Sequence, residues 1–178
     1  MRRLAEVNRH KLIDVLNERA ASERASARLY GRVVERVANA EPAIRRMLAR
    51  LELQRDEELE HGRWLEAQLR ALGSDGFAVT ARTQRVIGEL RGLEALILDG
   101  GASIPELFHA LLIAELADAV GWHLLVKLAE RADDRPAVEA FGKRLANQEE
   151  HVAFLRRAAE EFLRNDVLGV AVTMPIGP

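Results

Sequence analysis

A glutamate and a histidine, Glu58 and His61, lie three positions apart within the segment EELEH of residues 57–61. Because positions i and i+3 fall on one face of an α-helix, both side chains can point to the same place. A carboxylate and an imidazole presented together can bind a metal ion. The chain has no cysteine, so any metal site must work without thiolate. One such pair is weak evidence, because charged helices often contain it by chance.

The chain contains a second copy of this pattern. The segment HGRWL from His61 matches HVAFL from His151, and each histidine follows a cluster of acids. Glu23 in ERASARLY and Glu115 in ELADAVGW each precede an aromatic residue by seven positions. The separation of glutamate and histidine is 38 residues in the first copy and 36 in the second. This internal repeat predicts that two helix pairs aim equivalent side chains at one point.

Apolar residues recur every three or four positions over four long stretches, which predicts four long helices. The first covers about residues 8–38 and the second about 42–72, beginning at a proline. The third runs from Ser103, a helix cap, to about residue 131, and the fourth follows ADDRPAV and ends near residue 164. A weaker helical segment at residues 80–101 carries two internal glycines and forms a crossover.

These patterns predict an all-α protein with one domain, since 48% hydrophobic residues can supply a sizeable core. Short loops within each helix pair and one long crossover, with its short helix, between helices 2 and 3 match a ferritin-like four-helix bundle in residues 1–165. Residues 166–178 are apolar and contain Gly and Pro. We expect this C-terminal tail to be non-helical and to pack along the bundle or on a neighbour.

Charge and hydropathy exclude several kinds of partner. The net charge is only −2 and acids alternate with bases, so no basic field indicates nucleic-acid binding. No apolar run is long enough to span a membrane, and the N-terminus lacks the pattern of a signal peptide. We therefore expect a cytoplasmic protein with neither a membrane nor a nucleic acid as its partner.

Burying several carboxylates in an apolar core is unfavourable unless they are protonated or a cation neutralises them. Imidazole and carboxylate without thiolate suit iron or manganese, and two histidines on opposed helices indicate two ions. Asp118 lies at i+3 from Glu115 and becomes a fourth carboxylate if it turns inward. The four negative charges that balance two divalent ions would come from Glu23, Glu58, Glu115 and Asp118.

On these residues the chain resembles the ferritin-like di-iron carboxylate proteins, and its pattern is closest to the erythrin module of rubrerythrin without the rubredoxin domain. The resemblance covers about residues 10–164. It implies that Glu23 and His61 hold one ion and that Glu115 and His151 hold the other. It also implies that a glutamate in each Glu-x-x-His motif bridges the two ions, a role that falls to Glu58.

Two positions bear on how far the resemblance extends. Asp118 stands where the family has an extra ligand on helix 3, and its side chain is one methylene shorter than that of a glutamate. Gln148 stands where the family has the second bridging glutamate, three residues before His151. A glutamine offers a carbonyl oxygen but no charge, so Gln148 is a weak or substituted ligand. The sequence therefore leaves open whether a second ion binds with full affinity.

Two other side chains near these motifs have less specific interpretations. Tyr30 either fills the core or donates a hydrogen bond to a ligand carboxylate, as outer groups around metal sites commonly do. Glu57, on the charged part of its helix, is expected to be solvated.

The resemblance implies a di-iron oxidoreductase, with manganese as the other metal considered, that reduces peroxide or dioxygen and forms a homodimer. Without a rubredoxin domain its electrons must come from a separate donor. Three alternatives remain at this stage. They are a di-iron hydroxylase resembling tRNA-modifying hydroxylases, which have a similar EELEH segment, a non-enzymatic iron-binding or storage protein, and a scaffold that has lost its metal because of Gln148.

Overall fold

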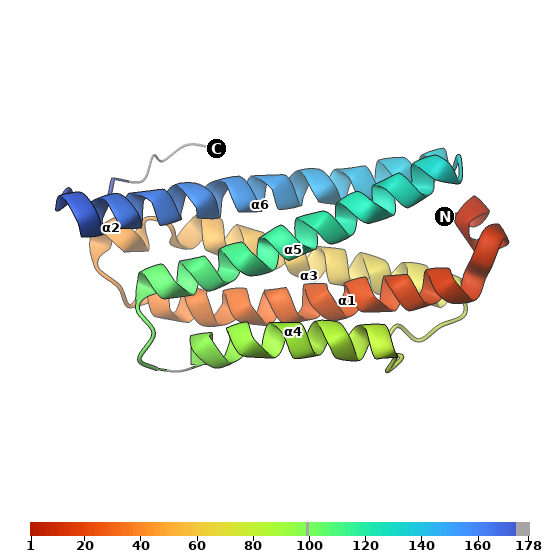
Figure 1. Cartoon of the computed structure of the whole chain (residues 1–178), viewed down its shortest axis with the longest axis horizontal. Helices are drawn as coiled ribbons and strands as arrows, with labels where there is room; N and C mark the ends of the chain where they lie inside the picture. The colour runs from red at the N-terminus through yellow and green to blue at the C-terminus, as the bar shows by residue number, and fades with distance from the viewer. Residues whose placement is uncertain (99, 174–178) are drawn as a thin grey trace.

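The structure is a computed structural model that describes residues 1–98 and 100–173, and within these residues the chain forms six helices and no strand (Figure 1). The helices are α1 (Arg2–Ala38), α2 (Pro42–Arg45), α3 (Leu48–Ala71), α4 (Ala81–Leu98), α5 (Ile104–Arg131) and α6 (Arg135–Leu168). The predicted all-α fold is confirmed. Helices α1, α3, α5 and α6 are the four long helices of the bundle, and α4 is the helix of the crossover.

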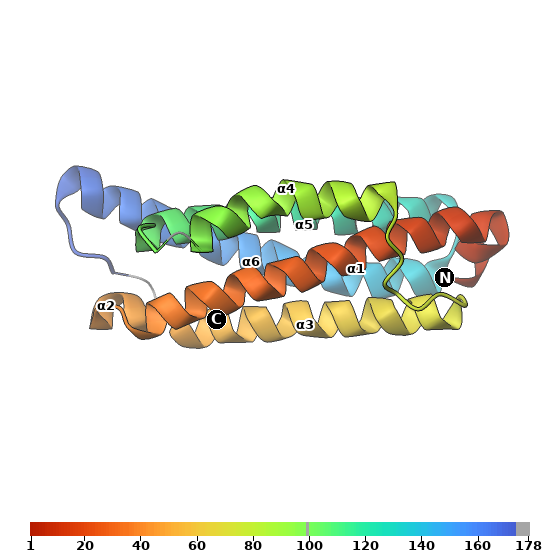
Figure 2. The same ribbon diagram turned by 90° about the horizontal axis from the view of Figure 1, so that it is seen from below.

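The bundle consists of two helix pairs joined by the crossover. Helix α1 packs mainly on α3, α5 packs mainly on α6, and α1 also contacts α5. Helix α4 runs back along α1 to the end of the bundle at which α3 began, so α5 runs parallel to α3 (Figure 1). Figure 2 shows α1 lying between α3 and α4. The long crossover is therefore what lets two equivalent helix pairs face each other across the core.

The ends of the long helices follow local sequence signals. Ser103 and Glu106 form a capping box at the start of α5, in which the Ser103 side chain accepts a hydrogen bond from the Glu106 N–H. Asp134 caps α6 by accepting one from the Ala137 N–H at 3.3 Å. Helix α6 ends at Gly169, which has a left-handed φ of 65°.

Three helix boundaries differ from the sequence prediction. The predicted start at Asn8 is a break inside α1, where φ is −161° and the side chain caps the following turn through the Lys11 N–H. The predicted second helix divides into α2 and α3, because Met47 N–H bonds to Ile44 in a tighter i→i−3 turn. Helix α6 continues three residues past the predicted domain boundary at residue 165, since no helix breaker precedes Gly169.

The tail is non-helical over residues 169–173, and Val172 packs against the core. The remainder of the predicted tail, residues 174–178, lies outside the described residues.

The core has two apolar parts. One contains Leu29, Val33, Leu111 and Leu155, and the other contains Leu16, Leu65, Trp122 and Phe141, with further aliphatic residues in each. Along every long helix a buried polar segment separates residues of the first part from residues of the second. The bundle thus encloses a polar layer midway along its length.

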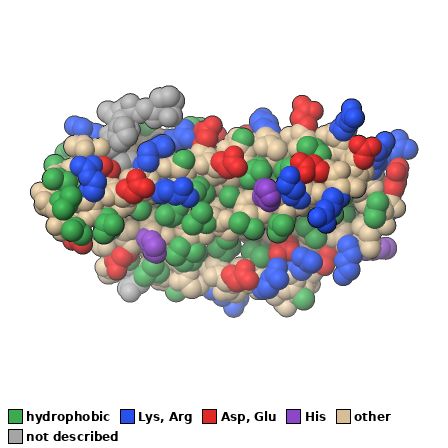
Figure 3. Space-filling view, turned by 45° about the horizontal axis from the view of Figure 1, so that its top comes forward, with side chains coloured by type: hydrophobic (Ala, Val, Ile, Leu, Met, Phe, Trp, Pro, Cys, Tyr) green, Lys and Arg blue, Asp and Glu red, His purple; other side chains and the backbone are tan. Residues whose placement is uncertain are grey.

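The surface carries acids and bases in alternation on the face shown in Figure 3, with hydrophobic side chains between them. This agrees with the small net charge of −2. Within residues 1–98 and 100–173, no helix combines the length and apolar character needed to cross a bilayer.

Candidate metal centre

Five of the predicted ligands meet in the polar layer, and they come from all four long helices. Helix α1 provides Glu23, α3 provides Glu58 and His61, α5 provides Glu115, and α6 provides His151. Their exposed fractions lie between 0% and 2%. The i, i+3 spacing in α3 does place glutamate and histidine on one inward face, as the sequence predicts.

These side chains form two groups that share one carboxylate. Glu23, Glu58 and His61 each offer a ligand atom, and these atoms lie within 4.8 Å of one another. Glu58, Glu115 and His151 meet the same limit. Each group can hold a metal ion, and Glu58 lies where a bridging ligand would.

Both histidines turn the same nitrogen toward the carboxylates. His61 Nδ1 lies 3.3 Å from Glu23 Oε2. His151 Nδ1 lies 3.1 Å from Glu115 Oε2 and 3.2 Å from Glu58 Oε1. Nδ1 is therefore the nitrogen of each ring that is placed to bind a metal ion.

Several of these ligand atoms lack a hydrogen-bond partner although they are buried. They are Glu23 Oε2, Glu58 Oε2, Glu115 Oε1 and His61 Nδ1. Leaving a buried polar atom unsatisfied costs about 1–3 kcal/mol, and more for a charged group. A divalent cation between these oxygens and nitrogens would satisfy all of them at once, so the residues fit a metal centre.

The carboxylates differ in how strongly they hold a proton. Burial raises the pKa of Glu58 well above its usual range, and the charges of Glu115 and Glu23 add to this effect. Burial also raises the pKa of Glu115 to about 7 despite its contact with His151. Burial would raise the pKa of Glu23 too, but His61, Arg19 and a hydrogen bond with Glu58 together outweigh burial and the net pKa is lowered. Without a cation, burial therefore favours the protonated forms of Glu58 and Glu115.

The outer nitrogen of each histidine contacts a residue that the sequence interpretation missed. His151 Nε2 lies 2.8 Å from Glu57 Oε2, and His61 Nε2 lies 3.5 Å from Asn147 Nδ2. The prediction that Glu57 is simply solvated is therefore wrong. Its hydrogen bond to His151 lowers the pKa of Glu57 below the usual range, against the opposing effect of burial. Glu57 and Asn147 each lie four residues before the histidine of their own helix. Comparing the two repeats at that position could have identified them.

Gln148 lies beside the shared carboxylate, as its place in the repeat predicts. Its Nε2 donates a hydrogen bond of 2.6 Å to Glu58 Oε1. Its Oε1 is buried without a partner. The amide therefore offers one neutral oxygen to the centre while its N–H group occupies part of the shared carboxylate.

Asp118 turns inward but belongs to neither group of ligands. Arg19 Nη2 and Ser22 Oγ each donate a hydrogen bond of 2.5 Å to its Oδ1, and Ser26 Oγ donates one of 3.2 Å to Oδ2. A side chain at Gly121 would overlap the Arg19 guanidinium, so this glycine makes room for the pair. The interpretation of Asp118 as a fourth metal carboxylate is not supported by these contacts, because an arginine neutralises it instead.

The two aromatic residues of the repeat have different roles. Trp122 Nε1 donates a hydrogen bond of 2.8 Å to Glu23 Oε1 and holds this ligand in place. Tyr30 is fully buried in the apolar core and donates to Gln54 Oε1 at 3.4 Å. Burial raises the pKa of Tyr30 well above its usual range, and the charges of Glu115 and Glu58 and a hydrogen bond to Glu115 add to this effect. Tyr30 also packs edge-on against the His151 ring at 6.1 Å, as Trp122 does against His61 at 5.7 Å.

Comparison with known protein families agrees with this geometry. The model of the ferritin-like domain matches residues 13–164, a span that includes all five ligands. The chain belongs to the ferritin-like family. No curated protein and no solved structure matches it. The ferritin-like assignment and the two ligand groups together support a metal-binding protein, whereas the closer likeness to rubrerythrin stays a prediction.

Proposed function

We propose that this ferritin-like protein is a di-iron oxidoreductase that reduces peroxide or dioxygen with electrons from a separate donor. The observation that carries the proposal is the pair of carboxylate–imidazole groups joined by Glu58 inside a dry core. Oxygen and imidazole ligands without thiolate suit iron. Two ferrous ions bound there would supply the two electrons that cleavage of an O–O bond requires.

Burial favours a small oxidant over a large substrate. The five ligand side chains are at most 2% exposed. A tRNA or another macromolecule could not touch the centre without a large rearrangement of the helices, whereas peroxide or dioxygen needs only a narrow path. The apolar core on both sides of the centre would also exclude water and strengthen the electrostatic interactions within it.

The side chains of the centre would hold the ions in a defined geometry and would release protons when the ions bind. Trp122 orients Glu23, and Glu57 orients His151, through the contacts described above. The raised pKa of Glu58 and of Glu115 favours their protonated forms when no cation is present, and binding of a cation would release these protons. These protons would leave the carboxyl oxygens of Glu58 and Glu115, which would then be free to bind the cation.

Anaerobic titration with Fe²⁺, followed by addition of peroxide or dioxygen, tests the proposal. We expect two equivalents of iron to bind and to be oxidised on addition of the oxidant. The variant Glu23→Gln/Glu115→Gln removes one charged ligand from each group and should lose most of this binding. Glu60→Gln/Glu150→Gln is the matched control, because each of these exposed glutamates directly precedes a histidine of the centre.

The two parts of the proposal can fail separately. Binding of less than about half an equivalent of both iron and manganese would contradict the metal centre and favour the scaffold. Full iron binding without oxidation by either oxidant would contradict the redox activity but keep the metal centre.

A further inference from the structure

Helix α5 presents an apolar face to solvent. Five of its large hydrophobic side chains are between 42% and 62% exposed, and no other helix of the described residues exposes as many. They are Ile113, Leu116, Val120, Leu124 and Leu128. Glu115 and Asp118 lie on the opposite, buried side of the same helix. A continuous exposed apolar row marks an interaction site, whereas scattered hydrophobic residues do not.

Four exposed residues of this face form a straight row, which we call the seam. They are Ile113, Ala117, Val120 and Leu124. Their separations of four, three and four residues place them on one line along the helix. The same alternation of spacing lets two helices pack along each other in coiled coils. The seam therefore has the pattern of a surface that packs on another helix.

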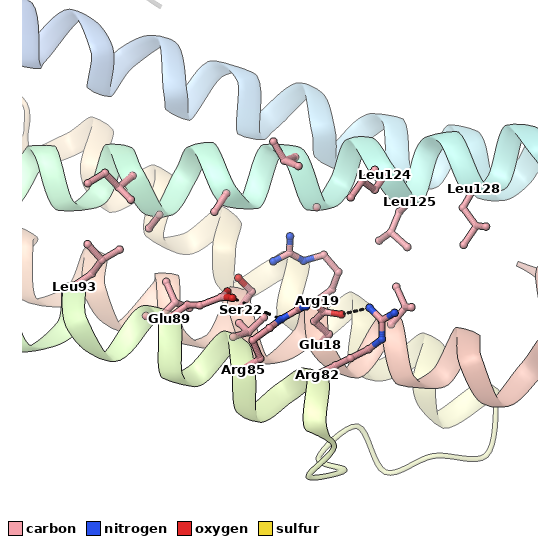
Figure 4. Close-up of a pocket in the computed structure, with 18 residues that line it drawn as sticks. Glu18, Arg19, Ser22, Arg82, Arg85, Glu89, Leu93, Leu124, Leu125 and Leu128 are labelled. Atoms are coloured by element: carbon pink, nitrogen blue, oxygen red, sulfur yellow. Dashed lines mark hydrogen bonds and ion pairs between the residues drawn. The ribbon is translucent and has the colours of Figure 1, made fainter.

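The seam borders a hollow of about 600 Å³ between α5 and α4, with α1 as its floor (Figure 4). Leu90 and Leu93 line the hollow from α4, and Leu124 and Leu128 line it from α5. Leu124 and Leu128 are 62% and 42% exposed, so much of this hydrocarbon is in contact with water. A helix placed along the seam would cover these side chains, and the burial of apolar surface would drive its binding.

A charged residue of opposite sign lies beyond each end of the seam. Glu106 precedes Ile113 by seven residues and Arg131 follows Leu124 by seven, so both lie on the same face as the seam. Both side chains are exposed, and within residues 1–98 and 100–173 neither forms an ion pair. The Glu106 carboxylate only accepts hydrogen bonds from Ser103 in the helix cap. The face is therefore negative at its N-terminal end and positive at its C-terminal end.

The face is symmetrical about the midpoint of the seam, which lies between residues 118 and 119. Its residues fall into three pairs whose members are equally far from this midpoint, namely Glu106 and Arg131, Ile113 and Leu124, and Ala117 and Val120. Rotation by half a turn about the midpoint therefore places each acid over a base and each apolar residue over another apolar residue. This self-complementarity identifies the same face of a second copy as the matching partner.

We propose that the seam binds the seam of a second copy of this chain, with the two α5 helices antiparallel about a two-fold axis. Glu106 of each copy then meets Arg131 of the other, and Ile113 meets Leu124. A parallel arrangement would instead bring like charges together at both ends. Apolar side chains at the centre and charge pairs at the rim are the usual composition of a protein interface.

Sedimentation equilibrium of the purified full chain tests the proposal, and we expect a dimer at micromolar concentrations. Leu124→Glu places a carboxylate on the seam and should raise the dimer Kd by roughly a hundredfold or more. Leu53→Glu is the matched control, because Leu53 is 47% exposed on α3, which packs mainly on α1. It should leave the dimer Kd unchanged. A wild-type chain that stays monomeric, or an equal effect of the two variants, would overturn the proposal.

The end charges test the orientation of the two copies. Arg131→Glu places two acids at each end of the interface and should raise the dimer Kd by roughly tenfold. Glu106→Gln keeps a side chain that supports the helix cap but removes the charge. It should weaken the wild-type dimer yet tighten the Arg131→Glu dimer. An effect of the same sign in both backgrounds would contradict antiparallel pairing. Circular dichroism and the midpoint of thermal unfolding confirm that each variant is folded.

Crosslinking tests the register, because the chain has no cysteine of its own. A mixture of the Ile113→Cys and Leu124→Cys proteins should crosslink with a short bismaleimide. Neither protein should crosslink with itself, since the two copies of each cysteine lie about 16 Å apart along the helix axis at 1.5 Å per residue. Crosslinking of either variant alone, or none in the mixture, would overturn the proposed pairing.

Discussion

The two halves of the metal centre differ in charge although their backbones repeat. The α1–α3 half contributes Glu23, Glu58 and His61, and the α5–α6 half contributes Glu115 and His151 with Gln148 at the position equivalent to Glu58. Each half thus has one histidine and one terminal glutamate. Only one of the two possible bridging positions carries a charge.

The outer contacts partly reverse this difference. The histidine of the α5–α6 half contacts the carboxylate of Glu57, whereas the histidine of the α1–α3 half contacts the neutral amide of Asn147. The α5–α6 half thus lacks a carboxylate at Gln148 but has one at Glu57, on the side of His151 that faces away from the candidate ligand group. Asp118, which the sequence interpretation counted as the fourth charge, is neutralised by Arg19. The comparison teaches that a metal centre can keep its charge balance through a residue that is not itself a ligand.

Replacing Glu58 with glutamine should have the largest effect, because this carboxylate belongs to both halves. We expect both iron-binding steps to weaken by roughly a hundredfold or more, as measured by anaerobic calorimetry. Glu60→Gln, on the same helix but exposed, should bind like the wild-type chain. Loss of only one step would show that Glu58 serves one ion and that the halves are independent.

Replacing Gln148 with glutamate should make the two halves equivalent. In the metal-free protein it replaces the 2.6 Å hydrogen bond to Glu58 by contact between two buried carboxyl groups, which should destabilise the fold by about 3 kcal/mol. Bound iron would offset this, and we expect the weaker iron-binding step to tighten roughly tenfold. Thermal unfolding with and without iron measures both effects. A variant whose weaker step does not tighten would place Gln148 outside the coordination of the second ion.

Replacing Glu57 and Asn147, which contact the outer nitrogens of the two histidines, should shift iron affinity from one half to the other. Glu57→Gln removes the carboxylate behind His151 and should weaken the ion of the α5–α6 half by roughly tenfold, the lower end for outer residues of metal sites. Asn147→Asp places a carboxylate behind His61 and should tighten the other ion. Iron titration of both variants and of the double variant tests this. Equal weakening of both steps by Glu57→Gln would mean that it acts through general stability.

A change of pH should reveal the smallest difference between the two halves. Glu115 has a folded-state pKa of about 7, above its ordinary value, so in the metal-free protein it contributes stability that is present below about pH 4.5 and lost as the pH rises through 7. The pKa of His151 is raised to about 11, because burial lowers it less than the hydrogen bonds to its carboxylate partners raise it. Its contribution to stability is therefore also lost as the pH rises above 6.5. Glu23, whose pKa is lowered, does not titrate in this range.

Between pH 5 and pH 8, therefore, the metal-free protein should become less stable to denaturant while iron binding becomes tighter, because the ligands must lose protons. The step assigned to the α5–α6 half should be the steeper one. Metal-free stability that rises over this range would contradict the proposed protonation of the centre.

Much of the fold and the five side chains of the two ligand groups could be predicted, because they depend on local spacing and on the internal repeat. Glu58 and His61 share a helix face by their i, i+3 separation alone, and the repeat extends this to Glu115 and His151. Prolines and capping residues indicate several helix ends as well, whereas the end of α6 before Gly169 was not predicted. The break at Asn8 was not predicted. The periodicity placed the start of the first helix near this residue, whereas α1 begins at Arg2.

The amino-acid sequence by itself determined the all-α fold, the order of its helices, and the inward direction of five candidate metal ligands. Only the tertiary structure decided that Asp118 pairs with Arg19 and that Glu57 reaches His151. The physical reason is that periodicity specifies which face of a helix is buried. Contacts at the edges of that face depend on the crossing angles of neighbouring helices and on which partner comes within hydrogen-bond distance.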